Sequence, residues 1–341
     1  MKKLIYFFCF LLLAACGNKK SKPSAESEQT PVKVEEKSFI EFGGEKQYVE
    51  MTGESSNDPV LLFLHGGPGW PQTPHLRYFN ADLTKTMILV AWDQSGCGRS
   101  FMNDSTSKGL TLEKCISDAH ELTQILKKKF NKSKIYLAGF SWGSVVGLHL
   151  IEKYPEDYSA YIAISQVINF KKGAQITRDW ITQQAKAKND TETLKVLKQL
   201  SAGDASICKR PIDCFIKQYE QLSKYHGAIY SDSSEKEIDK AVSLYDDYKN
   251  YNWMKGFFNS AYQLEKDVIS VDFTALKEVK VPVYFFMGRH DWNVPTSITE
   301  EFVKNLLAPK KEIVWFENSA HEPLEEEAGK FNQEVIKIVV K

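Results

Sequence analysis

The sequence has no excess of either charge, no internal repeat and no apolar run long enough to cross a bilayer comfortably. Its 341 residues include 44 Lys and Arg and 44 Asp and Glu, so no net charge draws the chain to nucleic acid or to an acidic partner. We therefore exclude nucleic-acid binding. Hydrophobic residues make up 43% of the chain, which is enough for one large domain or for a domain with an insertion.

The N-terminal segment predicts export and anchoring. An apolar run at residues 4–15 follows two lysines and ends directly before Cys16, which resembles a bacterial lipobox. We expect residues 1–15 to be a lipoprotein signal peptide and Cys16 to carry lipid; the alternative is an ordinary secretory signal with a chance cysteine. Residues 16–36 are polar and predict a flexible tether. The chain would then be anchored to a membrane of the bacterial cell envelope, facing the periplasm or the exterior.

Cysteine is sparse, with six residues in the chain. The segment CKRPIDC spaces Cys208 and Cys214 around a proline-containing turn, and an oxidising envelope permits a disulfide between them. The alternative is two free thiols. Because no nearby pair of His or Cys completes a zinc ligand set, we expect no metal site, and we expect no cofactor.

Short, nearly continuous apolar segments recur along the chain. Residues 38–42 and 46–53 flank Gly43-Gly44 and predict a β-hairpin. The other predicted strands are residues 59–69, 87–98, 134–143, 158–165, 281–291 and 311–321. Such runs are typical of strands buried on both faces of a mostly parallel sheet, and helical patterns lie between them. The alternation predicts an α/β fold, with a mostly parallel central sheet flanked by helices.

One interval breaks this alternation. Residues 167–278 contain no good candidate for a buried strand and form instead an aromatic-rich series of helical patterns. A helical insertion here would lie over the carboxyl ends of the strands as a cap and exclude water from a pocket. The expected organisation is a core of residues 37–166 and 279–341, interrupted by a helical cap of residues 167–278.

The segment GFSWG, residues 139–143, places a serine between two glycines where a predicted strand turns into a predicted helix. This is the G-x-S-x-G nucleophile-elbow pattern. The turn projects the hydroxyl clear of the sheet, at the positive end of the following helix. Ser141 is therefore the predicted nucleophile of a serine hydrolase, and the alternative is a plain tight turn.

A serine nucleophile needs a base to take its proton and an acid to orient that base. The chain order Ser, Asp, His is met by Asp291, after one predicted strand, and by His321, after the last. We expect Ser141, His321 and Asp291 to form a catalytic triad. Asp267 is the alternative acid, and His290 is expected to be structural.

The segment HGGPG, residues 65–69, follows a predicted strand and lacks the phosphate-loop pattern. Gly67 can offer a backbone N–H where a side chain would block approach, and Trp142, directly after the nucleophile, offers a second. We expect these two groups to form an oxyanion hole; the alternative for the glycines is a simple turn. His65 is expected to support this loop through hydrogen bonds.

Together, HGGPG, WDQSGCGRS, GFSWGS and GRHD resemble the prolyl aminopeptidase (proline iminopeptidase) branch of the α/β-hydrolase superfamily. The resemblance covers residues 60–165 and 280–325. It implies an α/β-hydrolase fold and removal of an N-terminal residue, typically proline, from peptides, with acidic groups of a helical cap holding the free amine. The chain departs from the family at Ser95, where an arginine is usual, and at Phe140, where a small residue is frequent, which alters the floor of the pocket.

The substrate pocket is expected to be lined by aromatic side chains, with core packing as the alternative. The candidates are Trp70, Phe140, Tyr245 and Trp253. The cap carboxylates considered for binding an amine are Glu220, Asp246, Asp247 and Glu265.

The leading function is a serine hydrolase that acts through an acyl-enzyme, as an aminopeptidase releasing an N-terminal residue such as proline from small peptides. A carboxylesterase or lipase-like hydrolase of small esters would use the same residues. A lipoprotein that binds a ligand without catalysis is the alternative from another class, and the intact set Ser141, Asp291 and His321 argues against it.

Overall fold

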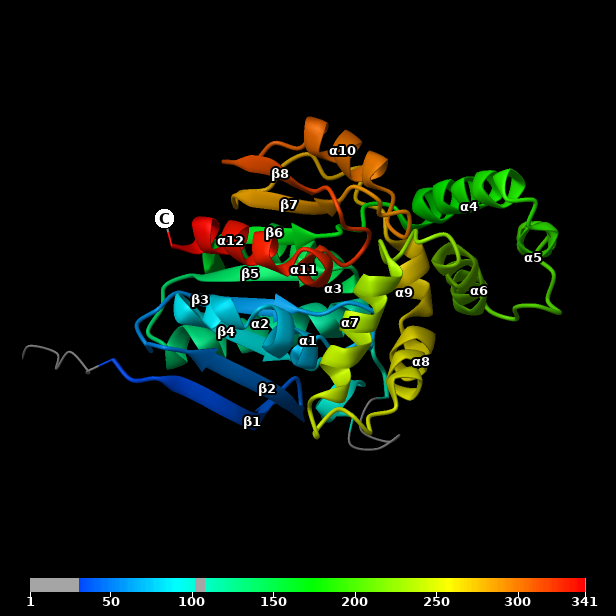
Figure 1. The fold of residues 1–341 in the computed structure, drawn as a ribbon. Coiled ribbons are helices and arrows are strands. Elements are labelled where there is room, and N and C mark those ends of the chain that lie inside the picture. Colours follow the sequence, from blue (N-terminus) through cyan, green and yellow to red (C-terminus); the bar gives the residue numbers. More distant parts are fainter. Residues whose placement is uncertain (1–30, 102–107, 341) are drawn as a thin grey trace, which may run out of the picture. The chain divides into compact units, whose positions relative to one another are not determined.

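A central eight-stranded sheet organises the chain, in the order β1-β2-β4-β3-β5-β6-β7-β8 (Figure 1). The structure is a computed structural model and describes residues 31–101 and 108–340, so the predicted signal peptide and Cys16 lie outside the described residues. The strands are β1 (Val34–Phe42), β2 (Glu45–Gly53), β3 (Val60–Leu64), β4 (Ile88–Trp92), β5 (Ile135–Phe140), β6 (Tyr158–Ile164), β7 (Val283–Gly288) and β8 (Lys311–Phe316). Strands β3 to β8 pair in parallel, and β2 pairs antiparallel with β4, so the predicted α/β fold is confirmed.

The predicted hairpin is present, but its first strand begins earlier than expected. Strand β1 pairs antiparallel with β2, and Val34 lies opposite Gly53. Residues 34–36, which the sequence analysis placed in the tether, therefore belong to the sheet. The charges that made this stretch look like tether are tolerated because β1 is an edge strand: Glu36, for example, pairs with Lys129 at 2.7 Å.

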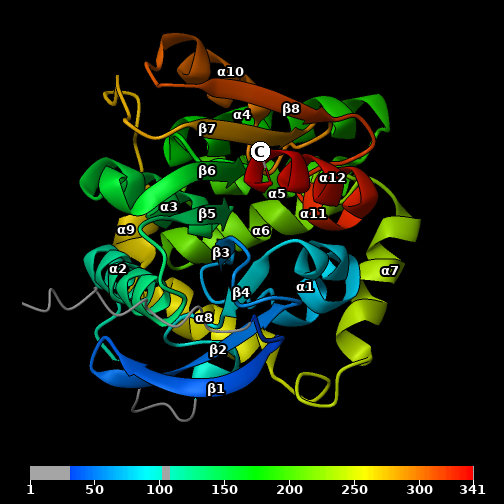
Figure 2. The same cartoon turned by 90° about the vertical axis from the view of Figure 1, so that its left-hand side faces the viewer.

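Helices cover both faces of the sheet, and a further group follows β6 (Figures 1 and 2). Helices α2 (Leu112–Lys129), α3 (Trp142–Lys153) and α10 (Thr296–Asn305) pack on one face. Helices α1 (Thr73–Phe79), α11 (Pro323–Glu326) and α12 (Ala328–Val339) pack on the other. Between β6 and β7 come α4 (Phe170–Ala187), α5 (Thr191–Ser201), α6 (Pro211–Ser223), α7 (Asp232–Ser243), α8 (Trp253–Gln263) and α9 (Glu265–Ser270), beyond the carboxyl ends of the strands.

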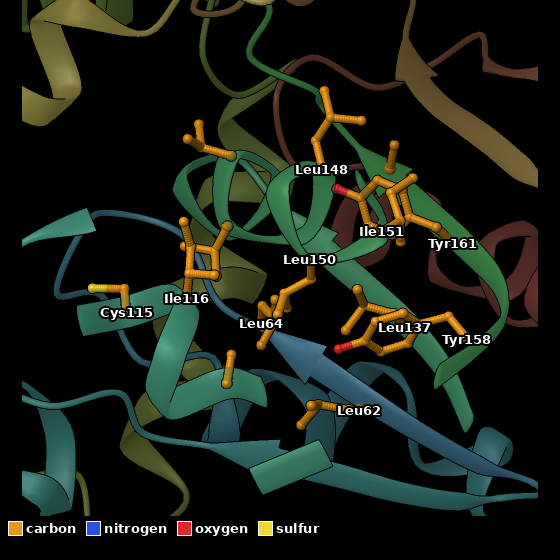
Figure 3. Close-up of a cluster of buried hydrophobic side chains, with 14 of the residues drawn as sticks. Leu62, Leu64, Cys115, Ile116, Leu137, Leu148, Leu150, Ile151, Tyr158 and Tyr161 are labelled. Carbon is orange, nitrogen blue, oxygen red and sulfur yellow. The ribbon is translucent and has the colours of Figure 1, made fainter. Parts of the chain in front are cut away.

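The sheet separates two hydrophobic clusters, as the strand geometry requires. Successive side chains of a strand point to opposite faces, so Leu62 of β3 joins the cluster under α2 and α3, whereas Phe63 joins the cluster under α1 and α12. Figure 3 shows the first cluster, in which Leu62 and Leu137 of the sheet lie near Leu150 of α3. Burial on both faces explains why the inner strands are nearly continuous apolar runs in the sequence.

The inserted helices α4 to α9 have a small core and a covalent link of their own. Ile181 and Ala185 of α4 and Leu222 of α6 are fully buried together. Cys208, which precedes α6, and Cys214, in the first turn of α6, are joined by a disulfide with a Cα–Cα distance of 5.1 Å. Within the described part of the chain, no helix combines the length and the apolar character needed to cross a bilayer.

Candidate active site

Ser141 occupies a strained turn between β5 and α3. Its φ of 51° and ψ of −114° fall where residues with side chains are rarely found. A Cβ atom on Gly143 would lie 2.1 Å from the Leu64 carbonyl oxygen, and one on Gly139 would lie 2.5 Å from the Gly143 carbonyl oxygen. The two glycines therefore allow β5 to turn into α3 within one residue, which brings the Ser141 hydroxyl to the carboxyl end of the sheet.

Three side chains far apart in the sequence meet at this turn. His321 Nε2 lies 3.0 Å from Ser141 Oγ, and His321 Nδ1 lies 2.9 Å from Asp291 Oδ2. Both His321 and Asp291 are buried, with 5% and 3% of their surface exposed. In the neutral tautomer that fits this geometry, Nδ1–H donates to Asp291 and Nε2 is free to accept the Ser141 proton. The structure thus brings together the three residues that the sequence predicted to meet.

The second oxygen of Asp291 holds the carboxylate in place. Asp291 Oδ1 accepts the backbone N–H groups of Asn293 at 2.9 Å and Val294 at 2.8 Å. The alternative acid, Asp267, instead accepts the N–H of Leu112 at 3.0 Å at the start of α2. Asp291 therefore has one oxygen for the backbone and one for the imidazole.

His290, next to Asp291, faces a different neighbour from the triad. Its ring packs against Tyr230 with a centroid distance of 4.7 Å, and the backbone N–H of His290 donates to the Ser319 carbonyl. These contacts fit the structural role expected for His290.

A turn between α6 and α7 contacts the loops that carry Asp291 and His321. The sequence carries no sign of this contact. The Gly227 carbonyl accepts the N–H of Trp292 at 2.9 Å, and the Ala228 carbonyl accepts the N–H of His321 at 3.0 Å. On the other side, Ser165 Oγ donates to the His321 carbonyl at 2.9 Å. The loop carrying the base is thus held by hydrogen bonds from the inserted helices and from the end of β6.

The HGGPG loop packs directly against the nucleophile. A Cβ atom on Gly66 would lie 3.2 Å from Ser141 Cβ. Gly67 has a φ of 110°, a value that favours glycine. Within the described residues, neither the Gly67 N–H nor the Trp142 N–H donates a hydrogen bond to a protein acceptor. Both groups are therefore available to a substrate oxygen.

His65 supports this loop as expected. Its Nδ1 lies 2.8 Å from the Gly66 carbonyl, and its Nε2 accepts the N–H of Gln94 at 3.0 Å. Burial lowers the pKa of His65 to about 4, so the ring is neutral near pH 7. One nitrogen donates and the other accepts, which fixes its tautomer and ties the HGGPG loop to the loop after β4.

The four aromatic residues expected in the pocket lie in different places. The Phe140 ring packs against the His321 ring at a centroid distance of 5.2 Å, and Trp70 packs against Trp253 at 5.0 Å. Tyr245 instead lies under the Arg77 guanidinium, 5.0 Å from its centre, and lines a surface hollow of about 270 Å³ beside β1 and β2. Tyr245 and Arg77, which are distant in sequence, make a cation–π contact there. Both residues line that hollow.

All four cap carboxylates considered for binding an amine are already paired with a cation. The pairs are Glu220 with Lys217, Asp246 with Lys249, Asp247 with Arg77, and Glu265 with Arg210, at N–O distances of 2.9, 2.6, 2.8 and 3.2 Å. A carboxylate neutralised in this way has less charge to offer a substrate. The structure therefore assigns none of the four to an amine site.

Three glutamates directly after the base form an acidic group that the sequence analysis passed over. Glu326 accepts the N–H groups of Tyr230 and Ala320, and burial raises its pKa to about 7. Glu325 Oε1 lies 2.7 Å from His75 Nδ1, although without hydrogen-bond geometry. Glu322 Oε2 is buried and has no hydrogen-bond partner. The run of acids in HEPLEEE was the available signal.

The described residues contain no group of three or more His, Cys, Asp or Glu side chains placed to hold a metal ion.

Comparisons with known proteins agree with this geometry. Residues 79–328 match the family model described as serine aminopeptidase, S33. The chain is 31% identical over 296 residues to "Probable aminopeptidase YbaC" of Bacillus subtilis (strain 168), covering 86% of this chain and 92% of that protein. It is 22% identical over 314 residues to a proline iminopeptidase of Lactobacillus delbrueckii subsp. bulgaricus, covering 86% and 94%.

Solved structures share the fold at low sequence identity. The proline iminopeptidase of Mycobacterium smegmatis superposes with a TM-score of 0.65 at 17% identity, covering 89% of this chain and 97% of that one. An esterase from Exiguobacterium antarcticum gives 0.59 at 18% identity, covering 89% and 99%. The fold is therefore that of the α/β-hydrolases, and the protein is a hydrolase enzyme. Because the family model matches well over half of the chain, this protein belongs to the serine aminopeptidase family S33.

Proposed function

We propose that this hydrolase is a serine aminopeptidase that releases an N-terminal residue, such as proline, from small peptides through an acyl-enzyme. The observation that carries the proposal is the unbroken series of hydrogen bonds from Ser141 through His321 to Asp291. The family and the names of the relatives support a peptide as substrate.

In the first half of the reaction, His321 Nε2 takes the proton of Ser141 Oγ as that oxygen attacks the carbonyl carbon of the scissile amide. Asp291 stabilises the imidazolium that forms and keeps its Nδ1–H directed away from the serine. The imidazolium then gives its proton to the departing amine, which leaves an ester on Ser141. A water molecule activated by His321 hydrolyses this ester in the second half.

The tetrahedral intermediates carry negative charge on the former carbonyl oxygen. In the proposal, the N–H groups of Gly67 and Trp142 donate to this oxyanion, and the N-terminus of α3 adds a favourable dipole. Glycine at 66 and 67 lets the loop approach Ser141 closely enough for such donation. Loss of one donor typically costs about 3 kcal/mol in the activation barrier.

A carboxylesterase acting on small esters is the second candidate. It is supported by the ion pairs that engage all four cap carboxylates expected to hold a substrate amine. The triad and the oxyanion donors would act on an ester in the same way, so only substrate recognition separates the two functions.

The deciding experiment measures the purified protein against prolyl and alanyl p-nitroanilides and against p-nitrophenyl acetate, with Ser141→Ala as the control. We expect turnover of the aminoacyl anilides that disappears in the control. Turnover of the ester without any aminoacyl turnover would establish the esterase instead. If a fluorophosphonate probe labels neither the wild type nor S141A, the non-catalytic ligand-binding lipoprotein becomes the better explanation.

The proposal extends to where the enzyme works. The lipobox-like sequence before Cys16 and the polar residues 17–33 that lead to β1 support a lipid-anchored enzyme of a bacterial cell envelope. We expect wild-type protein to sediment with membranes and Cys16→Ser to be released into the soluble fraction. Equal membrane association of the two forms would contradict the anchor.

A further inference from the structure

Glu322 stands out because its carboxyl group has no partner next to the catalytic base. It follows His321 directly, so their Cα atoms are about 3.8 Å apart. Its backbone N–H donates to Glu326 Oε1 at 3.2 Å, but its side chain makes no hydrogen bond or ion pair with any described residue. Glu322 Oε2 is fully shielded from solvent. A buried carboxyl group without a partner favours its neutral form, which burial expresses as a raised pKa, so a cation bound beside Glu322 would restore its charge and satisfy its oxygens.

The surroundings of Glu322 are acidic. Glu325, Glu326 and Asp291 all lie near enough to raise its pKa, in addition to the larger effect of burial. In the described part of the chain, no Lys or Arg pairs with Glu322, Glu325 or Glu326, and the imidazole beside the group is that of His75, whose Nδ1 lies 2.7 Å from Glu325 Oε1. The region therefore has a deficit of positive charge.

The turn after α6 lies against the loop that carries Glu322, since the Ala228 carbonyl accepts the N–H of His321 and the Tyr230 N–H donates to Glu326. Burial, and to a smaller extent the negative charge of Glu322, raises the pKa of the Tyr219 phenol in α6. Tyr219 nevertheless has 37% of its surface exposed.

The position of Glu322 matches a requirement of aminopeptidase chemistry. In an N-terminal residue, the α-amine is separated from the scissile carbonyl carbon by a single carbon atom. Its binding group must therefore lie close to Ser141 and His321, within the length of one residue. The four cap carboxylates are ion-paired, whereas Glu322 is unpaired and adjoins the base.

We propose that Glu322 is the specificity residue that binds the free α-ammonium group of the substrate, so that this site selects unblocked N-termini. The inference rests on the proposed aminopeptidase function. The ammonium supplies the missing positive charge, and a charge-assisted hydrogen bond to Glu322 places the scissile carbonyl over Ser141.

The test compares wild type and Glu322→Gln on two substrates. For alanyl p-nitroanilide, we expect kcat/KM to fall about 30-fold in E322Q, mainly through KM, because a bond to a charged group is replaced by a neutral one. For p-nitrophenyl acetate, which has no amine, we expect a change of less than about threefold. Glu220→Gln, the same change at an exposed cap position, is the matched control and should alter neither value.

A second measurement keeps the inference separate from the proposed function. Alaninamide is tested as a competitive inhibitor of ester hydrolysis, and its inhibition constant should rise about 30-fold in E322Q. If wild type cleaves no aminoacyl anilide, the aminopeptidase proposal fails, and the inhibition constant alone decides whether Glu322 binds an ammonium group. If wild type cleaves the anilide and E322Q is unchanged, only the role of Glu322 is overturned.

An equal loss on both substrates would also overturn the role, since it would make Glu322 a residue that positions His321. Should E322Q fail to fold, Glu322→Ser provides the second variant, because Glu322 occupies the N-cap of α11 and serine is favoured there. The same selective loss for amine-bearing molecules is expected.

Discussion

At the scale of single residues, the two oxygens of Asp291 have separate tasks. Oδ1 accepts two backbone N–H groups, and Oδ2 accepts the Nδ1–H of His321. The backbone bonds fix the carboxylate, and the fixed carboxylate selects the tautomer of the imidazole. In the proposed mechanism, catalysis at Ser141 therefore depends on a charge that never contacts the substrate.

Asp291→Asn tests this division. The amide oxygen of asparagine can keep the two backbone bonds, which leaves an NH₂ group facing His321 Nδ1. The NH₂ group of asparagine and an imidazole Nδ1–H are both donors and cannot hydrogen-bond to each other. The imidazole must therefore carry its proton on Nε2, and this nitrogen can then no longer accept the Ser141 proton. We expect kcat to fall by about 10³- to 10⁴-fold with little change in thermal stability. A loss below tenfold would contradict the role of Asp291.

The residues of the triad could be predicted from the sequence because their order along the chain and their places after strands are set by the fold. The partners of charged residues could not be predicted from the sequence. Asp247 was a candidate for an amine, but Arg77, 170 residues earlier, lies 2.8 Å from it. Whether an acid is free or neutralised depends on such contacts across the fold. The same reason explains why unpaired Glu322 was overlooked.

At the scale of elements, the turn between α6 and α7 links the cap to the chemistry. Its carbonyl groups at Gly227 and Ala228 accept the N–H groups of Trp292 and His321. The ring of Trp292 also stacks on Trp180 of α4 with a centroid distance of 5.0 Å. The cap thus holds the loops of the acid and the base, besides covering the strand ends.

Gly227→Ala tests this positioning role without altering the triad. A Cβ atom at Gly227 would lie 2.3 Å from Leu222 Cδ1 and 2.8 Å from Trp180, and Leu222 is fully buried. We expect the turn to shift, the free energy of unfolding to fall by about 1–3 kcal/mol, and kcat to fall about tenfold.

Gly329→Ala in α12 is the matched control, because a Cβ atom there meets nothing within 4 Å. It should leave kcat unchanged. A Gly227→Ala enzyme with lowered stability but unaltered kcat would show that the turn has no part in positioning the triad.

The strands and the inserted helices could be predicted because burial on two faces and the helical period leave clear patterns. The turn at 227–228 could not, since its contribution comes from backbone carbonyls, which every residue possesses. The early start of β1 at Val34 was hidden for a related reason: an edge strand tolerates charges that elsewhere indicate a polar linker.

At the scale of the whole molecule, the residues of the proposed active site are divided between the two parts of the core. Ser141 and the HGGPG loop precede the inserted helices, whereas Asp291 and His321 follow them. The site therefore exists only when both parts have joined one sheet, with β6 pairing with β7 across the insertion. Conditions that weaken this fold should therefore lower activity.

Mild acid is one such condition, and His65 provides a reason. Its folded pKa of about 4 lies below the usual value of 6.5, because burial disfavours the charged ring. Between pH 6.5 and 4 the unfolded chain takes up a proton that the folded protein refuses, so the free energy of unfolding falls as the pH falls. The contribution of this one residue reaches about 3 kcal/mol over that window. Urea unfolding of wild type and His65→Gln at intervals from pH 7.5 to 4 should give curves that converge toward acid. Parallel curves would mean that the pKa of His65 is the same in the folded and the unfolded protein.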